Sequence, residues 1–225
     1  MEKDLVVVLE ELAKKINKNY SGKKKDKFEK ELTGIINIYK TLEIPEALNE
    51  TYESLKNKGK ELMKESNIKN DKKLDYYLRY CRAAVYDFKG DLGHLNTIMK
   101  THMLTSMLFF ILAPQYFSYI LPLIFAIPIF LGFRGMRRRV QNGLFMGGAV
   151  VPMAILVAMV WIRNALITIS SGTFGEFINQ LAQSYGMSYE FSQNLAIACI
   201  ALSAVMLGSS LLFVYNAYKH RKMFI

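Results

Sequence analysis

Residues 101–133 contain no Asp, Glu, Lys or Arg, and this uncharged stretch constrains the chain more than any other feature. An α-helix needs roughly 20 mostly apolar residues, rising 1.5 Å each, to cross a bilayer. The stretch is long for one such crossing and short for two. Two later apolar segments, residues 140–162 and 194–218, each fit a single crossing. The sequence therefore predicts an all-α, multi-pass membrane protein.

The charged residues are concentrated in the first part of the chain. Residues 1–100 hold 21 of the 29 Lys and Arg and 17 of the 19 Asp and Glu. Their signs are interleaved, which is typical of solvated helix faces. The formal net charge of +10 is therefore no evidence for nucleic acid, which we do not expect as a partner. We interpret the basic run at residues 23–27 as a solvated turn, with anionic lipid or RNA as alternative contacts.

Apolar residues recur at steps of three and four through residues 1–95, a spacing typical of packed amphipathic helices. Four such stripes can bury one another, so we expect a cytosolic helical bundle over residues 1–95 and a transmembrane domain over residues 96–225. The stripes are Leu5, Val8, Leu9, Leu12 and Ile16, then Phe28, Leu32, Ile35, Tyr39 and Leu42, then Leu48, Tyr52, Leu55, Gly59 and Leu62, and finally Leu74, Tyr77, Cys81, Val85 and Phe88.

The distribution of Lys and Arg between the apolar segments predicts the orientation, because short cytosolic loops are enriched in both. Residues 164–192 contain neither and are expected outside as the outer loop. Residues 1–20 lack the apolar core of a signal peptide, which favours a cytosolic N-terminus. The residues that mark the cytosolic side are Arg134, Arg137, Arg138 and Arg139 in one loop, and Lys219, Arg221 and Lys222 at the C-terminus.

This orientation requires residues 101–133 to cross twice or not at all. Pro114 disfavours helix before it and fits the turn of a hairpin. We therefore predict approximate spans at 96–114, 116–133, 140–162 and 194–218, with Lys100 and His102 reaching the interface. A re-entrant hairpin, or one tilted span that would place the first domain outside, are the alternatives.

Small residues recur along the last two predicted spans and suggest close helix packing. We expect these spans to pack on each other, with a contact between copies of the chain as the alternative. The arginine loop is also a candidate contact for lipid phosphates. The small residues are Gly143, Gly147, Ala154 and Ala158 in one span and Ala201, Ala204 and Gly208 in the other.

Polar groups around the membrane suggest further contacts but no catalytic centre. We expect Arg163 to reach the outer interface beside Trp161, with an ion pair to Glu176 or Glu190 as the alternative. Asp87, Asp91 and His94 would share one helix face if the helix continued, which makes them a metal candidate, although no complete ligand set is evident. A passive pore could be lined by hydroxyl side chains. These are Thr105, Ser203, Ser209 and Ser210.

The sequence contains no GxxxxGK[ST], GxGxxG, HExxH or GxSxG motif. We expect a non-catalytic component or assembly platform of a membrane complex for secretion or transport, whose cytosolic bundle docks a soluble partner. A homo-oligomeric channel or passive transporter is the alternative, and a membrane enzyme acting on lipid or peptide is a second one. Membrane lipid, a soluble protein and further copies of the chain are the expected partners, with no cofactor, in the cell membrane.

Overall fold

The computed structural model describes residues 4–64 and 71–225. The structure is 88% helical, and the described residues contain no strand. The chain divides into two compact units, which are residues 1–93 with 222–225, and residues 94–221.

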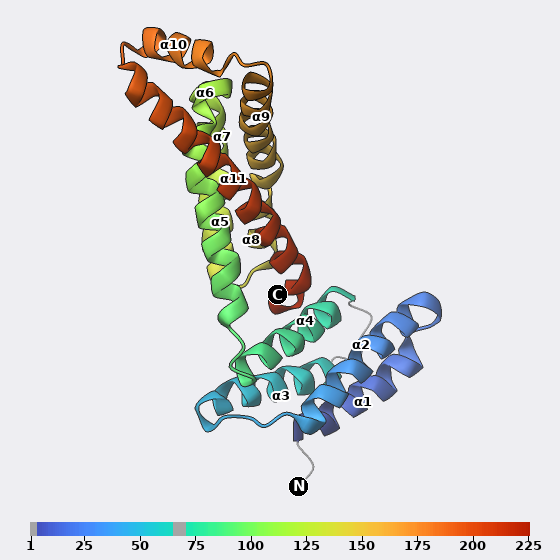
Figure 1. The fold of residues 1–225 in the computed structure, drawn as a ribbon. Helices are drawn as coiled ribbons and strands as arrows, with labels where there is room; N and C mark the ends of the chain where they lie inside the picture. The colour runs from blue at the N-terminus through green and yellow to red at the C-terminus, as the bar shows by residue number, and fades with distance from the viewer. Residues whose placement is uncertain (1–3, 65–70) are drawn as a thin grey trace. The chain divides into compact units, whose positions relative to one another are not determined.

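The described residues of the first unit form four α-helices that pack in a closed arrangement (Figure 1). They are α1 (Asp4–Asn19), α2 (Gly22–Thr41), α3 (Asn49–Lys64) and α4 (Asp71–Phe88), with a short 3-10 turn η1 (Glu46–Leu48) before α3. Helix α1 packs against α2 and α3, and α4 packs against the same two helices. The predicted apolar stripes form the core, and within them only Leu48 and Leu62 are less than fully buried.

Three buried tyrosines tie the helices of this core together through their hydroxyl groups. The Tyr39 hydroxyl donates to the Cys81 carbonyl at 2.9 Å, joining α2 to α4. The Tyr77 hydroxyl donates to the Leu55 carbonyl at 3.2 Å, joining α4 to α3. The Tyr52 hydroxyl accepts from the backbone N–H of Leu5 at 3.1 Å. The core therefore satisfies the polar ends of its tyrosines internally, as buried hydroxyls require.

The second unit contains the helices α5 (Gly93–Leu112), α6 (Pro114–Phe117), α7 (Ile120–Arg137), α8 (Gln141–Gly148), α9 (Val151–Ser170), α10 (Phe174–Tyr185) and α11 (Tyr189–Lys219); a last 3-10 turn, η2, covers Arg221–Met223. Within residues 4–64 and 71–225, four stretches are long and apolar enough to cross a membrane: Gly93–Leu112, Ile120–Arg137, Gln141–Ser170 and Tyr189–Lys219. The expected count of four candidate spans is confirmed by length and composition.

The predicted hairpin at residues 101–133 consists of α5 and α7, which run antiparallel. The Phe109 and Phe125 rings lie 5.6 Å apart, and the His102 side chain reaches the Ile129 carbonyl at 3.4 Å. The contact residues on α7 therefore have decreasing numbers as those on α5 increase, as in an antiparallel pair. Pro114 begins the short helix α6 between them, where a proline at the first helical position costs no hydrogen bond.

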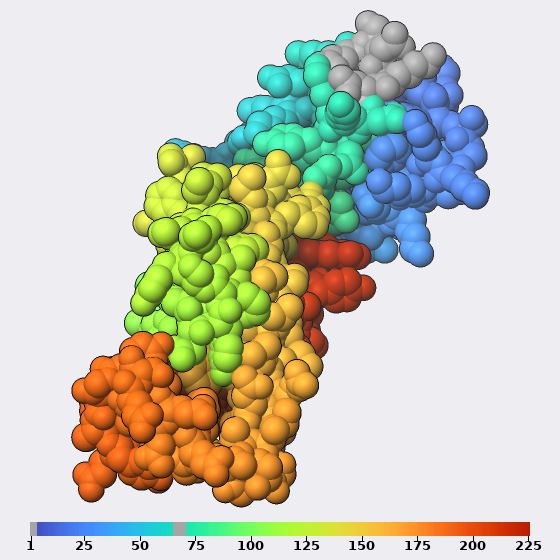
Figure 2. Space-filling view, turned by 90° about the horizontal axis from the view of Figure 1, so that it is seen from above, coloured from blue at the N-terminus to red at the C-terminus, as the bar shows by residue number. Residues whose placement is uncertain are grey.

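Three of the predicted spans differ from the observed helices by four or more residues at one end. The span expected at 116–133 is observed at Ile120–Arg137. The span expected at 140–162 extends to Ser170 and is interrupted between α8 and α9, just before Pro152. The last span begins at Tyr189 instead of near residue 194, because Ser188 caps α11 by accepting from the Phe191 N–H. Helix α10 lies in the expected outer loop and packs on α9 and α11. Figure 2 shows α10, in orange, against the end of α9.

Candidate functional site

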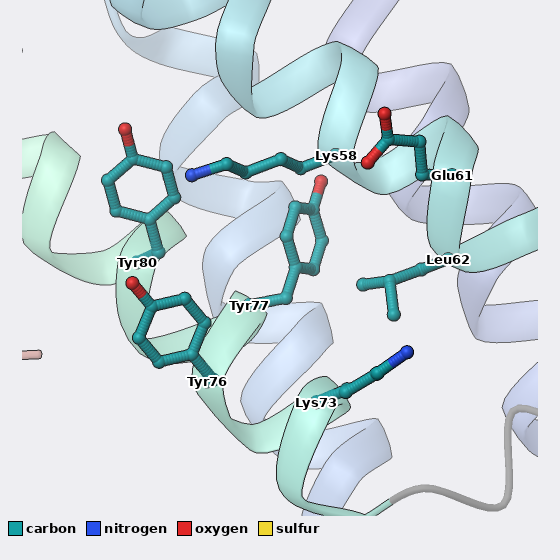
Figure 3. Close-up of a pocket in the computed structure, with 7 residues that line it drawn as sticks. All are labelled: Lys58, Glu61, Leu62, Lys73, Tyr76, Tyr77 and Tyr80. Carbon is teal, nitrogen blue, oxygen red and sulfur yellow. The ribbon is translucent and has the colours of Figure 1, made fainter.

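The first unit carries a groove between α3 and α4 (Figure 3). Its volume is about 230 Å³. Tyr77 is 2% exposed and lies at the base of the groove, whereas Tyr76 is 54% exposed at the rim. A Cβ on the neighbouring Gly59 would collide with the Tyr77 hydroxyl, so glycine at this position makes room for the ring. The lining residues are Lys58, Glu61 and Leu62 from α3, and Lys73, Tyr76, Tyr77 and Tyr80 from α4.

The charged side chains of the groove favour an anionic ligand. Lys58 and Lys73 outnumber the single carboxylate, Glu61. The Lys58 ammonium lies 4.2 Å from the centroid of the Tyr80 ring, a cation–π contact that orients it along the groove. Aromatic faces beside cations are suited to binding an acidic segment that also carries an apolar side chain.

The groups behind the groove are protonated and are not nucleophiles. Burial raises the pKa of the Tyr77 hydroxyl, which therefore stays a neutral donor to Leu55. Burial also raises the pKa of the Cys81 thiol to about 12. Because the thiolate is the reactive form of cysteine, Cys81 is a core residue at neutral pH.

The hydroxyl groups predicted to line a pore are buried inside the second unit. The Thr105 and Ser209 hydroxyls lie 2.9 Å apart and join α5 to α11. Ser203 donates to the Ile200 carbonyl, and Ser210 donates to the Met206 carbonyl of the same helix. Only the Thr105–Ser209 bond therefore joins two helices, whereas Ser203 and Ser210 bond to carbonyl groups of their own helix.

His102 is buried in the second unit, and the expectation that it reaches the membrane interface is wrong. Its side chain is 1% exposed, and its ring lies 5.4 Å from that of Phe213 on α11. Gly147 on α8 lies beside this ring, and a Cβ added there would come within 2.8 Å of the Met136 Cε and 3.4 Å of the His102 Cε1. An ionisable side chain inside a membrane unit is a functional candidate by default. His102 precedes Thr105 by three residues and Ser106 by four. This helical spacing is the sequence signal that could have identified a buried polar side of α5.

A second groove lies between α5 and α7, beside His102. Its volume is about 280 Å³ and almost all of its accessible lining is apolar. Behind that lining, the His102 Nδ1 and the Ser106 Oγ are buried without a hydrogen-bond partner. The groove is lined by His102, Met103, Ser106, Met107 and Phe110 on α5, and by Ile129, Phe130 and Phe133 on α7.

The predicted arginine loop is shorter than expected, because Arg134 and Arg137 lie in the last turn of α7 and only Arg138 and Arg139 lie in its connection to α8. Arg134, Arg137 and Arg138 are exposed, and Arg139 adopts a left-handed conformation with φ of 57°. Gly135 before this connection and Gly143 after it allow α7 and α8 to come into backbone contact. A Cβ on Gly135 would collide with the Gly143 backbone. The loop therefore closes a tight helical hairpin.

The small residues of the last two predicted spans occupy different environments. Gly143 and Gly147 face Gly135 and Gly132 of α7, and these partners were not predicted. Ala154 and Ala158 are buried in α9, which packs on α11. On α11 itself the small residues lie away from this contact. Ala201, Ala204 and Gly208 are exposed.

The other predicted contacts do not come together in the described part of the chain. Arg163, Glu176 and Glu190 are exposed, and no ion pair joins them there. Helix α4 ends at Phe88 and α5 begins at Gly93, so the assumption of one continuous helix through Asp87, Asp91 and His94 is wrong. Residues 4–64 and 71–225 contain no group of three His, Cys, Asp or Glu side chains arranged to hold a metal ion.

One further contact in the second unit joins residues far apart in the sequence. The His94 and His220 rings stack with centroids 3.8 Å apart and an interplanar angle of 17°. This pair brings the beginning of α5 to the end of α11. Neither histidine lies in a pattern that would indicate the other. Comparison with known proteins gives no further guidance, because no family model, curated protein or solved structure matches this chain.

Proposed function

We propose that this protein is a membrane-anchored docking platform, a non-catalytic component of a membrane complex for secretion or transport. In this proposal the N-terminal helical unit lies in the cytosol and recruits a soluble protein, while the four apolar helices anchor it in the cell membrane. The observation that carries the proposal is the aromatic and basic groove between α3 and α4. Its partner is a protein that presents an acidic segment with an apolar side chain.

The composition of the groove supports recognition. Tyr77 and Leu62 offer an apolar base, and Lys58 and Lys73 offer positive charge above it. Because Tyr77 is fixed by the Leu55 carbonyl and by the space that Gly59 leaves, the base is preorganised. Preorganised aromatic side chains lower the entropic cost of binding. Long-range attraction from the two lysines would speed the encounter with an acidic segment.

The proposal is tested by site-specific cross-linking of the full chain in cells. A photoreactive amino acid at Tyr76, on the groove rim, is expected to capture one soluble protein with an acidic segment. The same amino acid at Asn37, exposed on α2, is the control and should not capture it. Capture of lipid alone, or equal capture from both positions, would contradict the proposal.

Charge reversal then distinguishes specific docking in the groove from nonspecific electrostatic binding. The double variant Lys58→Glu and Lys73→Glu should abolish co-purification of the captured protein. The matched control Lys14→Glu and Lys18→Glu makes the same change in net charge on exposed positions of α1 and should leave it intact. If both variants still co-purified with the captured protein, the groove would not be the docking site.

The proposed sidedness follows from the cationic loops and has its own test. With Cys199 replaced by serine and Cys81 buried, a cysteine introduced at Gln115 or Ser184 should react with an impermeant maleimide from outside the cell. Labelling of either position from the cytosolic side alone would overturn the proposed orientation.

The exposed stripe Ala201, Ala204 and Gly208 favours a homo-oligomeric channel as the second candidate function. A Cβ on Gly208 meets nothing within 4 Å in the single chain, which leaves room for another helix. Small residues permit such close approach in lipid. In nanodiscs, Gly208→Leu should then convert an oligomer to a monomer and abolish ion flux. A monomer before substitution would leave the docking platform as the proposed function.

A further inference from the structure

Six exposed basic side chains gather at one end of the second unit. Helices α5 and α7 run antiparallel, with His102 beside the Ile129 carbonyl, so the end of α7 lies beside the first half of α5. The stacked rings of His94 and His220 bring the end of α11 to the start of α5. We call these six residues the cationic end. They are Lys100, Arg134, Arg137, Arg138, Lys219 and Arg221.

The carboxylates of the second unit lie too far away to neutralise the cationic end. Residues 94–221 contain only two of them, Glu176 on α10 and Glu190 in the first turn of α11. Lys219 ends the same helix that Glu190 begins, so the two are about 43 Å apart along its axis. Charges interact over only about 8 Å at physiological salt. The positive charge of this end is therefore not balanced within its own unit.

Three arginines share one side of the last turn of α7. Arg137 and Arg138 follow Arg134 by three and four residues, and the Arg138 N–H donates to the Arg134 carbonyl at 3.2 Å. Like charges at this spacing repel each other. Among residues 4–64 and 71–225, no carboxylate forms an ion pair with any of the three. An anion from outside the chain would relieve this repulsion.

Exposed tyrosines accompany the basic residues at the end of α11. The Lys219 Nζ lies 3.5 Å from the Tyr215 hydroxyl, and the Arg221 Cζ lies 5.0 Å from the centroid of the Tyr218 ring. Tyr215 is 59% exposed and Tyr218 is 71% exposed. Tyrosine is enriched at the membrane–water interface, at the level of the lipid headgroups. The anion that fits this depth is a headgroup phosphate.

We propose that the cationic end binds anionic phospholipids, with Arg134, Arg137 and Arg138 as the headgroup contact. A guanidinium can form two parallel hydrogen bonds with phosphate oxygens. Phosphatidylcholine also carries a phosphate, but its choline cation would lie against the same arginines, whereas phosphatidylglycerol has a net negative charge. Each Lys or Arg near an anionic surface strengthens binding about fivefold. The inference shares with the docking platform only the placement of the four apolar helices in a membrane.

The proposal is tested by the lipids that the full chain retains from micelles with equal amounts of phosphatidylglycerol and phosphatidylcholine of matched acyl chains. Mass spectrometry should find at least about fivefold more phosphatidylglycerol on the protein, and this excess should fall as salt rises. Excess glycerol 1-phosphate should not displace the lipid. Equal retention of the two lipids would overturn the proposal, as would displacement by glycerol 1-phosphate, which indicates a site for free phosphate esters.

Photolabelling locates the contact without any substitution. A phosphatidylglycerol with a photoreactive group next to its headgroup should label peptides that contain residues 134–140 or 215–221. Labelling confined to residues 163–190, at the carboxylate-bearing end of the unit, would contradict the proposed site.

Charge removal tests the three arginines directly. The triple variant Arg134→Gln, Arg137→Gln and Arg138→Gln should lower the retained phosphatidylglycerol to about the level of phosphatidylcholine. The matched control removes three exposed lysines of the first unit and should keep the excess. Its substitutions are Lys14→Gln, Lys18→Gln and Lys23→Gln.

The groove variant Lys58→Glu and Lys73→Glu should also keep the excess, which separates a failure of the docking proposal from a failure of this one. An undiminished excess in the arginine variant, or an equal loss in the lysine control, would overturn the assignment of the headgroup contact to α7.

Discussion

In the first unit the side chains that meet at the centre are large and apolar, whereas in the second unit the closest helix contacts are made by glycines and hydroxyl groups. Leu9, Leu12 and Leu55 are fully buried in the first. In the second, Gly135 meets Gly143 and Thr105 meets Ser209, while residues such as Ile124 and Leu211 point outward. Burying apolar surface drives packing in water, but lipid is as apolar as leucine, so close packing and hydrogen bonds must hold the second unit together.

Gly135→Val should have the largest effect, because it attacks the contact that distinguishes the second unit. The new side chain would collide with the Gly143 backbone, which cannot move aside as a flexible side chain could. We expect a loss of more than about 4 kcal/mol, or no folded protein. Unfolding by SDS in mixed micelles measures it. Gly148→Ala is the control, since a Cβ there meets nothing within 4 Å, and similar losses for both variants would contradict the glycine contact.

Leu55→Ala tests whether buried apolar side chains, and not close backbone contacts, stabilise the first unit. The side chain is fully buried, so its truncation should cost about 2–5 kcal/mol through lost burial and a cavity. Leu211→Ala on the lipid-facing side of α11, where Leu211 is 55% exposed, should change stability by only about 0.5 kcal/mol. Thermal unfolding followed by circular dichroism measures both. A large loss at Leu211 would show that another protein surface covers this position.

The Thr105–Ser209 contact gives a smaller effect that measures what one buried hydroxyl pair contributes in lipid. A double-mutant cycle with Thr105→Ala and Ser209→Ala should yield an interaction of about 0.6 kcal/mol. Tyr39→Phe in the first unit, which removes the bond to the Cys81 carbonyl, should cost about 1 kcal/mol. SDS unfolding of the full chain measures the cycle. An interaction free energy of zero would mean that each hydroxyl is as well satisfied by a carbonyl of its own helix as by the other hydroxyl.

The contrast between the units also explains what the sequence could predict. In water, apolar spacing reports directly which side is buried, so the predicted stripe on α4, from Leu74 to Phe88, is the observed core face. Pro114 similarly marked the turn between α5 and α7. In the four candidate spans nearly all sides of each helix are apolar, so hydrophobicity no longer separates the inside from the outside.

Several contacts of the second unit were not predicted, because hydrophobicity does not distinguish the buried sides of its helices. Gly143 and Gly147 were recognised as a packing pair, but nothing in their spacing identifies Gly135 and Gly132 as partners. His102 was expected to reach the interface near the start of the first span, yet its side chain is buried. Only small and polar residues carry information inside a membrane unit, and their partners depend on tertiary packing.

Acid should produce the smallest effect and should act on the first unit alone. The hydrogen bond from Lys24, followed by that from Tyr20, lowers the pKa of Asp71. At Asp75, burial raises the pKa, but Arg79 and Lys27 outweigh it and the net shift is downward. A folded-state pKa below the unfolded value of about 3.9 stabilises the unit fully above that pH, and the contribution is lost as the pH falls through the folded value.

Hydrogen exchange can resolve this difference because it reads each helix separately. Below about pH 4, peptides of α4 should lose protection in the wild type before those of α9 do, after correction for intrinsic exchange rates. Asp71→Asn should reduce this acid dependence, whereas Glu190→Gln, at an exposed carboxylate of the second unit, should not. Equal acid sensitivity of α4 and α9 would mean that the carboxylates of the first unit do not stabilise it selectively. The two units would then share one unfolding transition, and the contrast between their interiors would not extend to their stability.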